Sequence, residues 1–359
     1  MSRRPPRRVR IALPVAAILA AISGGCGPET PKAPAPPQRV YVSNETAGTV
    51  AVIDPVTGGV LAVLPVGKRP RGLRLSHDRR QLYVALSGSP IAPPGVDESS
   101  LPAADRSADG IAVVDIATRT IIRTIDSGRD PEAFALSPDG RWLYVSNEET
   151  AEMSVVDVAA GAVVRRVPVG DEPEGVTISP DGKVVYVTCE DDHSVVAVDT
   201  TSFAVLGRVL VGQRPRSIAV TPNGATLFVT DENSSSISVL NAARLTLADT
   251  IRLPRPDDTP TPPRPMGSVL SPDARLLFVT NGRARSVSVI DVEKRTVLRT
   301  IADVGQRPWG IGVSADGARL FTANGPGGDV SIIDVARGAV ERRINLGGSP
   351  WGIAVAAAP

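Results

Sequence analysis

Short apolar runs, broken by turn residues at intervals of about 8 to 12 positions, form the main pattern of this chain. In the stretch 168–209, four such runs lie at residues 175–179, 184–188, 194–199 and 205–209. Each run is rich in β-branched residues and too short for a typical helix, so each predicts a β-strand. Ser179-Pro180-Asp181-Gly182 separates the first two runs, where proline presets φ and glycine accepts a positive φ. The pattern predicts strands joined by tight hairpins.

This order of four runs recurs along the chain with a nearly constant period. Segments that match or resemble Gly-x-x-Pro align on seven prolines, which are Pro70, Pro131, Pro173, Pro215, Pro265, Pro308 and Pro350. The successive spacings are 61, 42, 42, 50, 43 and 42 residues. A unit of about 42 residues, interrupted by two insertions, is typical of a propeller or a solenoid.

Three motifs inside the unit point to a known family. Tyr144-Val145-Ser146-Asn147 ends one second strand, Ser-Pro-Asp-Gly closes the first hairpin, and Val287-Ser288-Val289-Ile290-Asp291 forms a third strand. Together they resemble the YVTN-type β-propeller repeat family, with its lactonase-like and cytochrome d1-like relatives, over roughly residues 40–359. The resemblance implies an all-β, seven-bladed propeller with four antiparallel strands per blade around a central channel. Fold alone does not decide which function such a propeller carries.

The two ends of the repeat region are predicted to share one blade. The region begins with second, third and fourth strands at 40–44, 50–54 and 60–64, and it ends with a lone first strand at 351–356. Pairing of these ends closes the ring and leaves no opening exposed. We therefore expect residues 39–359 to form one seven-bladed domain.

The first 38 residues are predicted to export and tether the protein. Residues 1–25 carry five arginines followed by a short apolar run, as in a signal peptide. Ser23-Gly24-Gly25-Cys26 resembles a bacterial lipobox, which implies cleavage before Cys26 and its lipidation. Residues 26–38 are rich in proline and predict an extended tether. We expect an exported, lipid-anchored protein in the periplasm or on the outer envelope surface, with the membrane as a partner. Plain periplasmic cleavage is the alternative, since Ser23 stands where a lipobox prefers leucine.

Charge and cysteine content narrow the partners. The chain has 39 basic and 38 acidic residues, and loss of the five signal-peptide arginines leaves a net charge near −4. Nucleic-acid binding needs clustered basic residues, so we expect no nucleic-acid partner. Beyond Cys26 the sequence has one further cysteine, Cys189, which predicts a small core residue rather than a disulfide. We expect a monomer, and the sequence assigns neither a metal nor a cofactor.

One face of the propeller is the candidate for function. Family geometry puts the loop before the first strand and the loop between the second and third strands on the same face, and the insertions 87–109 and 254–264 both fall there. Insertions in repeat proteins gather on binding faces, although two tolerated loop expansions are the alternative. The residues beside the repeated prolines should ring the channel mouth, and the candidate ligand-binding set is Arg69, Arg71, Glu132, Glu174, Arg214, Arg216, Arg264, Arg307, Trp309 and Trp351.

These mouth residues support two interpretations. Arginine forks and tryptophan faces can hold a carboxylate, a phosphate or a planar ring. Alternatively, neighbouring blades exchange salt bridges, because Arg71 lies beside Glu132 and Glu174 lies beside Arg216 in blade order. An aspartate also recurs at the ends of the third strands, and we interpret it as a turn residue because nearly every blade has it.

No recognisable catalytic set accompanies the mouth. Glu190-Asp191-Asp192-His193 offers carboxylates and a base for metal or hydrolytic chemistry, but a solvated acidic turn is the simpler interpretation. The other histidine, His77, falls on the opposite face, which argues against a multi-histidine metal site and against haem d1 with an axial histidine. Two hypotheses remain. One is a non-enzymatic envelope module that binds a small anion or an envelope protein, and the other is a lactonase-like hydrolase or cofactor-binding propeller with its site at the channel mouth.

Overall fold

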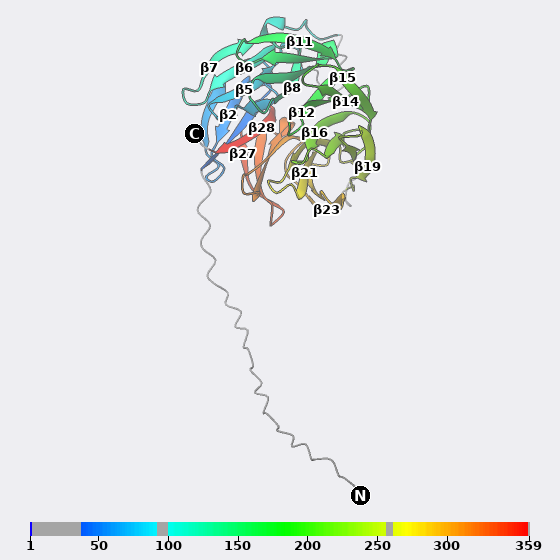
Figure 1. Ribbon diagram of the computed structural model, residues 1–359. Coiled ribbons are helices and arrows are strands. Elements are labelled where there is room, and N and C mark those ends of the chain that lie inside the picture. The colour runs from blue at the N-terminus through cyan, green and yellow to red at the C-terminus, as the bar shows by residue number, and fades with distance from the viewer. Residues whose placement is uncertain (2–36, 92–99, 256–260, 358–359) are drawn as a thin grey trace. The chain divides into compact units, whose positions relative to one another are not determined.

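The computed structural model describes Met1 and residues 37–91, 100–255 and 261–357. In these residues the chain forms seven four-stranded antiparallel sheets arranged as the blades of a propeller (Figure 1). The predicted all-β, seven-bladed fold is therefore confirmed. The predicted signal peptide, the lipidation site Cys26 and most of the tether lie outside the described residues. Within the described ranges, no helix is long and apolar enough to cross a membrane.

The blades are numbered here in the order of their inner strands. Blade 1 holds β4 (Leu73–Leu75), β5 (Gln81–Leu86), β6 (Gly110–Asp115) and β7 (Thr120–Ile125), with the short 3₁₀ helix η2 (Arg106–Ala108) in its long loop. Blade 2 holds β8 (Pro131–Leu136), β9 (Trp142–Asn147), β10 (Glu152–Asp157) and β11 (Ala162–Pro168), with η3 (Glu148–Thr150). Blade 3 holds β12 (Pro173–Ile178), β13 (Val184–Cys189), β14 (Ser194–Asp199) and β15 (Val205–Leu210).

The remaining blades repeat this plan. Blade 4 holds β16 (Pro215–Val220), β17 (Thr226–Asp231), β18 (Ser236–Asn241) and β19 (Thr246–Arg252). Blade 5 holds β20 (Pro265–Leu270), β21 (Leu276–Asn281), β22 (Ser286–Asp291) and β23 (Thr296–Ile301). Blade 6 holds β24 (Pro308–Val313), β25 (Arg319–Asn324), β26 (Asp329–Asp334) and β27 (Ala339–Asn345), with η4 (Gly325–Gly327). Blade 7 holds β28 (Pro350–Ala357), β1 (Gln38–Asn44), β2 (Thr49–Ile53) and β3 (Val60–Pro65).

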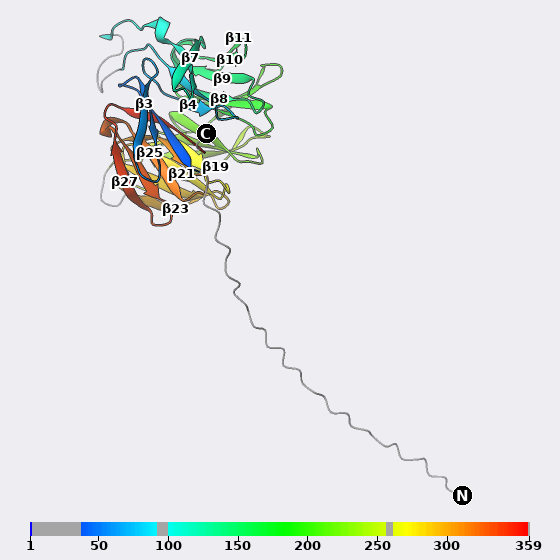
Figure 2. The same cartoon turned by 90° about the vertical axis from the view of Figure 1, so that its left-hand side faces the viewer.

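Blade 7 closes the ring as the sequence predicts. Its inner strand β28 comes from the C-terminal end of the chain and pairs antiparallel with β1, with Val355 opposite Val40 and Ile353 opposite Val42. In Figure 1 the red β28 lies beside the blue strands of this blade, and Figure 2 shows the blue β3 near the orange and red strands of blade 6. Both ends of the repeat region are therefore held in one hydrogen-bonded sheet.

The core is divided into apolar packets between neighbouring blades. Phe228 of β17 and Leu277 of β21 share one packet, and Phe278 of β21 and Leu320 of β25 share the next. Middle strands are buried on both faces because each sheet packs against two others, which explains their nearly continuous apolar sequences. Full burial of each such side chain contributes about 1.5–3 kcal/mol. Cys189 is buried in such a packet, as predicted, and burial raises the pKa of its thiol to about 12.

The first hairpin of blades 1, 2, 3, 5 and 6 is held by a serine and an aspartate, and in blade 4 Thr221 and Asn223 take their places. In blade 2 the Ser137 hydroxyl donates to Asp139 at 2.5 Å and accepts from the Trp142 N–H at 2.9 Å, while the N–H of Gly140 donates to the Ser137 carbonyl oxygen. Gly140 has a φ of 73°, which glycine adopts without steric cost. The predicted Ser-Pro-Asp-Gly turn is thus confirmed, with side-chain hydrogen bonds added to its backbone geometry.

A bulge in the inner strands turns the residue after the repeated proline toward the channel. In β12 the register shifts between Pro173 and Val176, and the same shift recurs in β8, β16, β20 and β24. Bulges re-aim side chains at sheet edges and beside functional sites. Glycine often follows, because a Cβ at Gly310 would lie 2.4 Å from the Trp351 carbonyl oxygen of the next blade. Inner strands can therefore approach closely around a narrow channel.

Candidate functional site

The two loop types at the channel mouth lie on one face, as expected. In blade 3 the N–H of Glu190, which follows the second strand, donates to the carbonyl oxygen of Glu172, which precedes the repeated proline, at 2.9 Å. Equivalent bonds join the same loops in five further blades, with donors Glu45, Ser87, Glu148, Glu232 and Gly282. The described part of insertion 87–109 lies on this face too, since Arg106 forms an ion pair with Glu149 beside η3.

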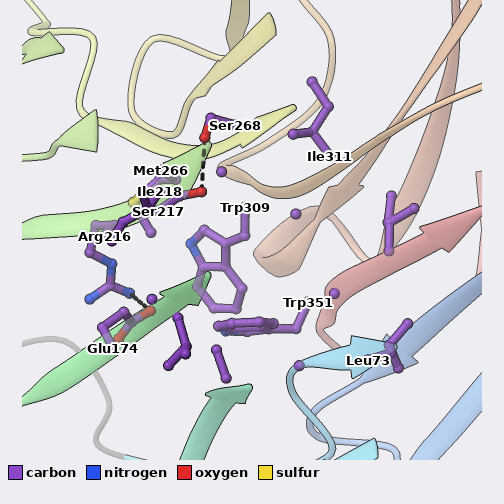
Figure 3. A pocket seen from close by; sticks show the side chains of 18 of the residues that line it. Leu73, Glu174, Arg216, Ser217, Ile218, Met266, Ser268, Trp309, Ile311 and Trp351 are labelled. Carbon is purple, nitrogen blue, oxygen red and sulfur yellow. Dashed lines mark hydrogen bonds and ion pairs between the residues drawn. The ribbon is translucent and has the colours of Figure 1, made fainter. Parts of the chain in front are cut away.

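A cavity of about 180 Å³ occupies the channel below this mouth. Trp309, Trp351 and Arg216 line its upper part, and a layer of small residues lies beneath them (Figure 3). The remaining lining is mostly apolar but includes the guanidinium of Arg74, whose Nε donates to the Phe134 carbonyl oxygen at 3.4 Å. The other residues of this part are Leu73, Phe134, Val176, Ile218, Ser268, Ile311 and Ile353. Pockets for drug-sized ligands usually measure about 300–1,000 Å³, so this cavity suits a smaller molecule of about one ring.

The residues directly after the repeated prolines divide the mouth into two sectors. Arg71, Glu132, Glu174 and Arg216 form what we call the ion-pair sector, and Met266, Trp309 and Trp351 form the aromatic sector. The first sector belongs to blades 1–4 and the second to blades 5–7. The mouth therefore presents charge on one side and aromatic surface on the other.

Arg71 is the centre of one half of the ion-pair sector. Its side chain is 3% exposed and forms ion pairs with Glu132, with Asp130 at 2.5 Å and with Glu148 at 3.3 Å. Ser87 also donates to Asp130 at 2.5 Å. Although burial opposes it, the charge of Arg71 and this hydrogen bond hold the pKa of Asp130 below its usual range. The cation is thus fully surrounded by carboxylates.

Arg216 is the central cation of the other half of the ion-pair sector. It forms ion pairs with Glu190, with Glu174 at 3.4 Å and with Glu232 at 3.9 Å, and Arg214 joins the cluster through Glu190 at 2.6 Å. Burial raises the pKa of Glu174 well above its usual range, and the charges of Glu190 and Glu148 add to this effect. In contrast, Arg216 and Arg214 overcome the effect of burial and lower the pKa of Glu190. Of the two acids, Glu174 is thus the one whose neutral form is favoured, and Glu190 is the one whose charged form is favoured.

The aromatic sector is built around Trp309. Its ring centroid lies 6.5 Å from that of Trp351 in an edge-to-face arrangement, and a Cβ at Gly325 would lie 3.0 Å from its benzo edge. Glycine at this position thus leaves space for the indole. The indole Nε1–H is buried and has no hydrogen-bond partner among the described residues. Figure 3 shows this nitrogen turned toward the side of the cavity where Arg216 and Glu174 lie.

The arginines beside the aromatic sector differ from those of the ion-pair sector. The guanidinium carbon of Arg307 lies 5.3 Å from the Trp309 ring centroid, within cation–π range. Within the described part of the chain, neither Arg307 nor Arg264 forms an ion pair, and Arg264 Nε is buried without a hydrogen-bond partner. Burial lowers the pKa of Arg307, and Arg216, Arg283 and Arg214 add to this, against the opposing charge of Glu232. Positive charge is therefore in excess at this end of the mouth.

The structure brings together most of the residues that the sequence singled out. The two predicted salt bridges, Arg71 with Glu132 and Glu174 with Arg216, are both present. The third-strand aspartates serve turns, as in Asp157, which accepts the Ala160 N–H at 2.9 Å. His193 Nδ1 lies 2.7 Å from the Glu190 carbonyl oxygen. Among the described residues, no group of three or more histidine, cysteine, aspartate or glutamate side chains is placed to hold a metal.

Sequence reasoning missed a second ring of acids outside the first. Glu45, Glu148, Glu190 and Glu232 each follow the last residue of a second strand, and each pairs with a mouth arginine. The interpretation of Glu190-Asp191-Asp192-His193 as a solvated turn is wrong for Glu190, which is 1% exposed, because two arginines draw it inward. The recurrence of glutamate at one blade position was the signal that could have revealed this ring.

Comparisons with known proteins agree with this architecture. The sequence profile of the YNCE-like beta-propeller family matches residues 94–359. Antigen Lp49 of Leptospira interrogans serovar copenhageni is 28% identical over 137 residues, a match that spans 30% of this chain and 30% of that curated relative.

Solved structures show the same fold at low sequence identity. The periplasmic gluconolactonase PpgL of Pseudomonas aeruginosa has a TM-score of 0.73 and 20% identity, covering 90% of this chain and 99% of that chain. Dihydro-heme d1 dehydrogenase NirN has a TM-score of 0.61 and 18% identity, covering 86% of this chain and 63% of that chain. The resemblance to lactonase-like and cytochrome d1-like propellers is thereby confirmed. From its repeats, its seven blades and this profile match, the chain belongs to the YNCE-like beta-propeller family.

Proposed function

We propose that this protein is a cell-envelope propeller that binds a small molecule at the channel mouth without converting it. The supporting observation is the cavity of about 180 Å³ in the channel, which Trp309, Trp351, Glu174 and Arg216 line. Small-molecule sites are typically concave, with aromatic walls and a few convergent polar groups. The cavity is therefore suited to bind a ligand.

The ion-pair sector supports binding rather than catalysis. Arg71 and Arg216 are each surrounded by three carboxyl groups, so these arginines and acids are committed to one another. A nucleophile or general base has to be within hydrogen-bond reach of the reacting atom and able to change partners during the reaction. Groups held in such a network stabilise the shape of the mouth instead.

Export to the envelope is the second half of the proposal. Residues 1–25 have the composition of a signal peptide, and Cys26 follows a lipobox-like sequence. The name of one structural neighbour, a periplasmic gluconolactonase, and the similarity to a Leptospira antigen are consistent with an exported protein.

A ligand screen with a turnover assay tests the proposal. The purified protein is heated with D-glucono-1,5-lactone, gluconate, benzoate, haem or a quinone, and a ligand at 100 times its Kd adds about 2.7 kcal/mol of stability. We expect at least one compound to raise the melting temperature and to be recovered unchanged. The Trp309→Phe variant should lose most of this effect. Trp142→Phe is the matched control, since Trp142 packs against Phe203, away from the cavity lining. If none of these compounds binds, the proposal fails and an envelope-protein partner takes its place.

A lactonase-like hydrolase is the second candidate, and Glu174 is the observation that favours it. This residue lines the cavity, its pKa is raised by burial, and it lies 3.4 Å from Arg216. A neutral carboxylic acid next to a cation can protonate a leaving oxygen. Hydrolysis of D-glucono-1,5-lactone that disappears in Glu174→Gln, while lactone binding remains, would establish this alternative.

A further inference from the structure

We infer that the aromatic sector, together with Arg307, forms a subsite for an oxyanion carried on one flat ring, with an aryl carboxylate as the representative ligand. This inference rests on the proposed function, because it specifies what the cavity binds. In it the ring lies in the cavity against Trp309 and Trp351, and the acid group lies toward Arg307 at the rim.

The charge distribution requires an anion on this side of the mouth. The ion-pair sector neutralises its own arginines, as shown by the three acids around Arg71 and the three around Arg216. By contrast, Arg307 has no ion pair among the described residues, and the charges that act on it are one acid, Glu232, and three arginines, Arg216, Arg283 and Arg214. A bound oxyanion would relieve this repulsion and would meet a guanidinium fork that suits its geometry.

The walls favour a flat ring over an extended chain. Trp309 and Trp351 stand edge to face with centroids 6.5 Å apart, and both line the cavity. The rest of the lining is mostly apolar, with Ser268, whose hydroxyl lies 2.9 Å from that of Ser217, and Arg74 as its polar members. Arg74 is a second cation that an oxyanion in the cavity could approach. Aromatic pairs gain about 0.5–1.5 kcal/mol beyond burial of area, which a ligand ring can share. A cavity of about 180 Å³ has room for roughly one such ring.

The Trp309 indole sets the position of the ring. Its Nε1–H is buried without a partner among the described residues, and it is turned toward the side where Arg216 and Glu174 lie (Figure 3). Arg307 lies 5.3 Å from the ring centroid of the same indole. One residue thus contacts both the cation that would bind the acid group and the space that would hold the ring.

Isothermal titration of the purified protein with four probes tests this subsite. Benzoate and phenyl phosphate carry an oxyanion on a flat ring, benzamide is the neutral isostere of benzoate, and 6-phosphogluconate is an oxyanion without a flat ring. We expect benzoate or phenyl phosphate to bind at least about tenfold more tightly than benzamide and 6-phosphogluconate, as one charge-assisted hydrogen bond implies. The tighter of the two identifies the acid group as carboxylate or phosphate.

Two variants assign the preference to its residues. Arg307→Gln should bring benzoate to the affinity of benzamide, and Trp309→Phe should weaken benzoate about tenfold while keeping a ring in place. Arg244→Gln is the matched control, since Arg244 is exposed in the turn between β18 and β19 and should leave binding unchanged. For the unaltered protein, inorganic phosphate should compete with benzoate and leave benzamide unaffected, a test that needs no variant to fold.

The outcomes separate this inference from the proposed function. Equal affinity for benzoate and benzamide, or an unchanged preference in Arg307→Gln, would overturn the oxyanion subsite while ligand binding stands. Tightest binding of 6-phosphogluconate would overturn the flat ring. Failure of all four probes, and of the lactone and cofactor panel above, would overturn both.

Discussion

The hydroxyl of Thr280 in blade 5 donates a 2.8 Å hydrogen bond to the backbone carbonyl oxygen of Trp309 in blade 6. It also accepts the N–H of Gly267 in its own blade at 2.9 Å. In four other blades a hydroxyl of the second strand donates a hydrogen bond to the backbone carbonyl oxygen of the mouth residue in the next blade. The pairs are Ser43 with Arg71, Ser146 with Glu174, Thr188 with Arg216, and Thr230 with Met266. The serine or threonine of the repeat motif therefore holds five of the seven mouth residues in position from the preceding blade, while Ala85 and Ala323 stand at this position before Glu132 and Trp351.

Thr280→Val should loosen the mouth at Trp309. Valine keeps the shape of threonine but leaves the Trp309 carbonyl oxygen and the Gly267 N–H without partners in a buried position. We expect a loss of about 1–3 kcal/mol in the free energy of unfolding, measured by urea denaturation. Thr280→Ser keeps the hydroxyl and should lose less. Equal stability of the two variants would show that the hydroxyl does not hold the blades together.

The fold could be predicted well from the sequence because similar turn residues recur at the same positions of successive repeats. The strands β13 and β14 begin within one residue of the predicted positions, since Pro180 and Gly182 mark the hairpin and alternate runs of valine mark the strands. Ring closure followed from counting strand types at the two ends. These features are local in sequence, and the geometry between blades follows from stacking identical units.

The candidate site was predictable only in part. Residues beside the repeated prolines were placed at the mouth, and the pairing of Arg71 with Glu132 followed from blade order. The role of Glu190 was missed, because its burial depends on two arginines that are more than twenty residues away in the chain. The free N–H of Trp309 depends on side-chain orientation, and Gly325 in η4 leaves room for the ring in that orientation.

Asp231→Asn should stabilise the protein at neutral and alkaline pH. Asp231 stands where Asn281 stands in blade 5, and burial raises its pKa to about 6. Since the folded-state pKa is above the usual value of about 3.9, the charged native form is disfavoured and stability falls as pH rises from about 4 through 6. We expect a gain of up to about 3 kcal/mol at pH 8, as the difference of about two pKa units implies.

The pH dependence of the stability gain in Asp231→Asn tests whether the gain comes from the charge of Asp231. Below about pH 4 Asp231 is protonated in both states, so Asp231→Asn should have little effect there. The reverse change Asn281→Asp should destabilise the protein, and more at pH 8 than at pH 4, because the Asn281 amide donates to Ser286 and Ser288 at 3.0 and 2.9 Å. Urea denaturation at the two pH values measures both variants. A pH-independent effect of Asp231→Asn would contradict the assignment.

Deletion of residues 349–359 should abolish cooperative unfolding. The deletion removes β28, which is the inner strand of blade 7 and carries Trp351. Without it, β1 becomes an unpaired edge and blade 6 loses its neighbour at the channel. Calorimetry should show a broad transition at much lower temperature. A chain that ends at Ala357 keeps β28 and should melt like the full protein, and equal melting of both truncations would rule out closure by β28.

Cys26→Ser should release the protein from the membrane fraction. The lipobox-like sequence before Cys26 implies that a lipid is attached to its thiol, which serine lacks. In a bacterial host, we expect the unaltered protein in the membrane pellet and the variant in the soluble envelope fraction or uncleaved. Mass spectrometry of the N-terminal peptide checks the modification. A soluble, unmodified wild-type protein would favour plain periplasmic cleavage.

Glu190→Gln and Glu174→Gln should lower the free energy of unfolding by different amounts, although each replaces one carboxyl group of the same cluster. Glu190 lies between Arg214 and Arg216, whose charges lower its pKa. Removal of its charge leaves the two cations to share the more distant Glu232, and we expect a loss of about 3–5 kcal/mol in the free energy of unfolding. Burial raises the pKa of Glu174 well above its usual range, which favours the neutral acid, and an amide replaces that form with little change in charge. Its variant should lose less than about 1 kcal/mol.

Urea denaturation at pH 7 compares these two variants, and Asp191→Asn, a change at an exposed neighbour, is the control for loss of one nearby carboxylate. Equal destabilisation by Glu190→Gln and Glu174→Gln would mean that both carboxyls are ionised in the folded protein. In that case Arg216 would be shared by two charged acids, and Glu174 would no longer be available as a proton donor. The result therefore also tests the hydrolase alternative, in which Glu174 is the general acid. A Glu174 that is charged at neutral pH cannot protonate a leaving oxygen.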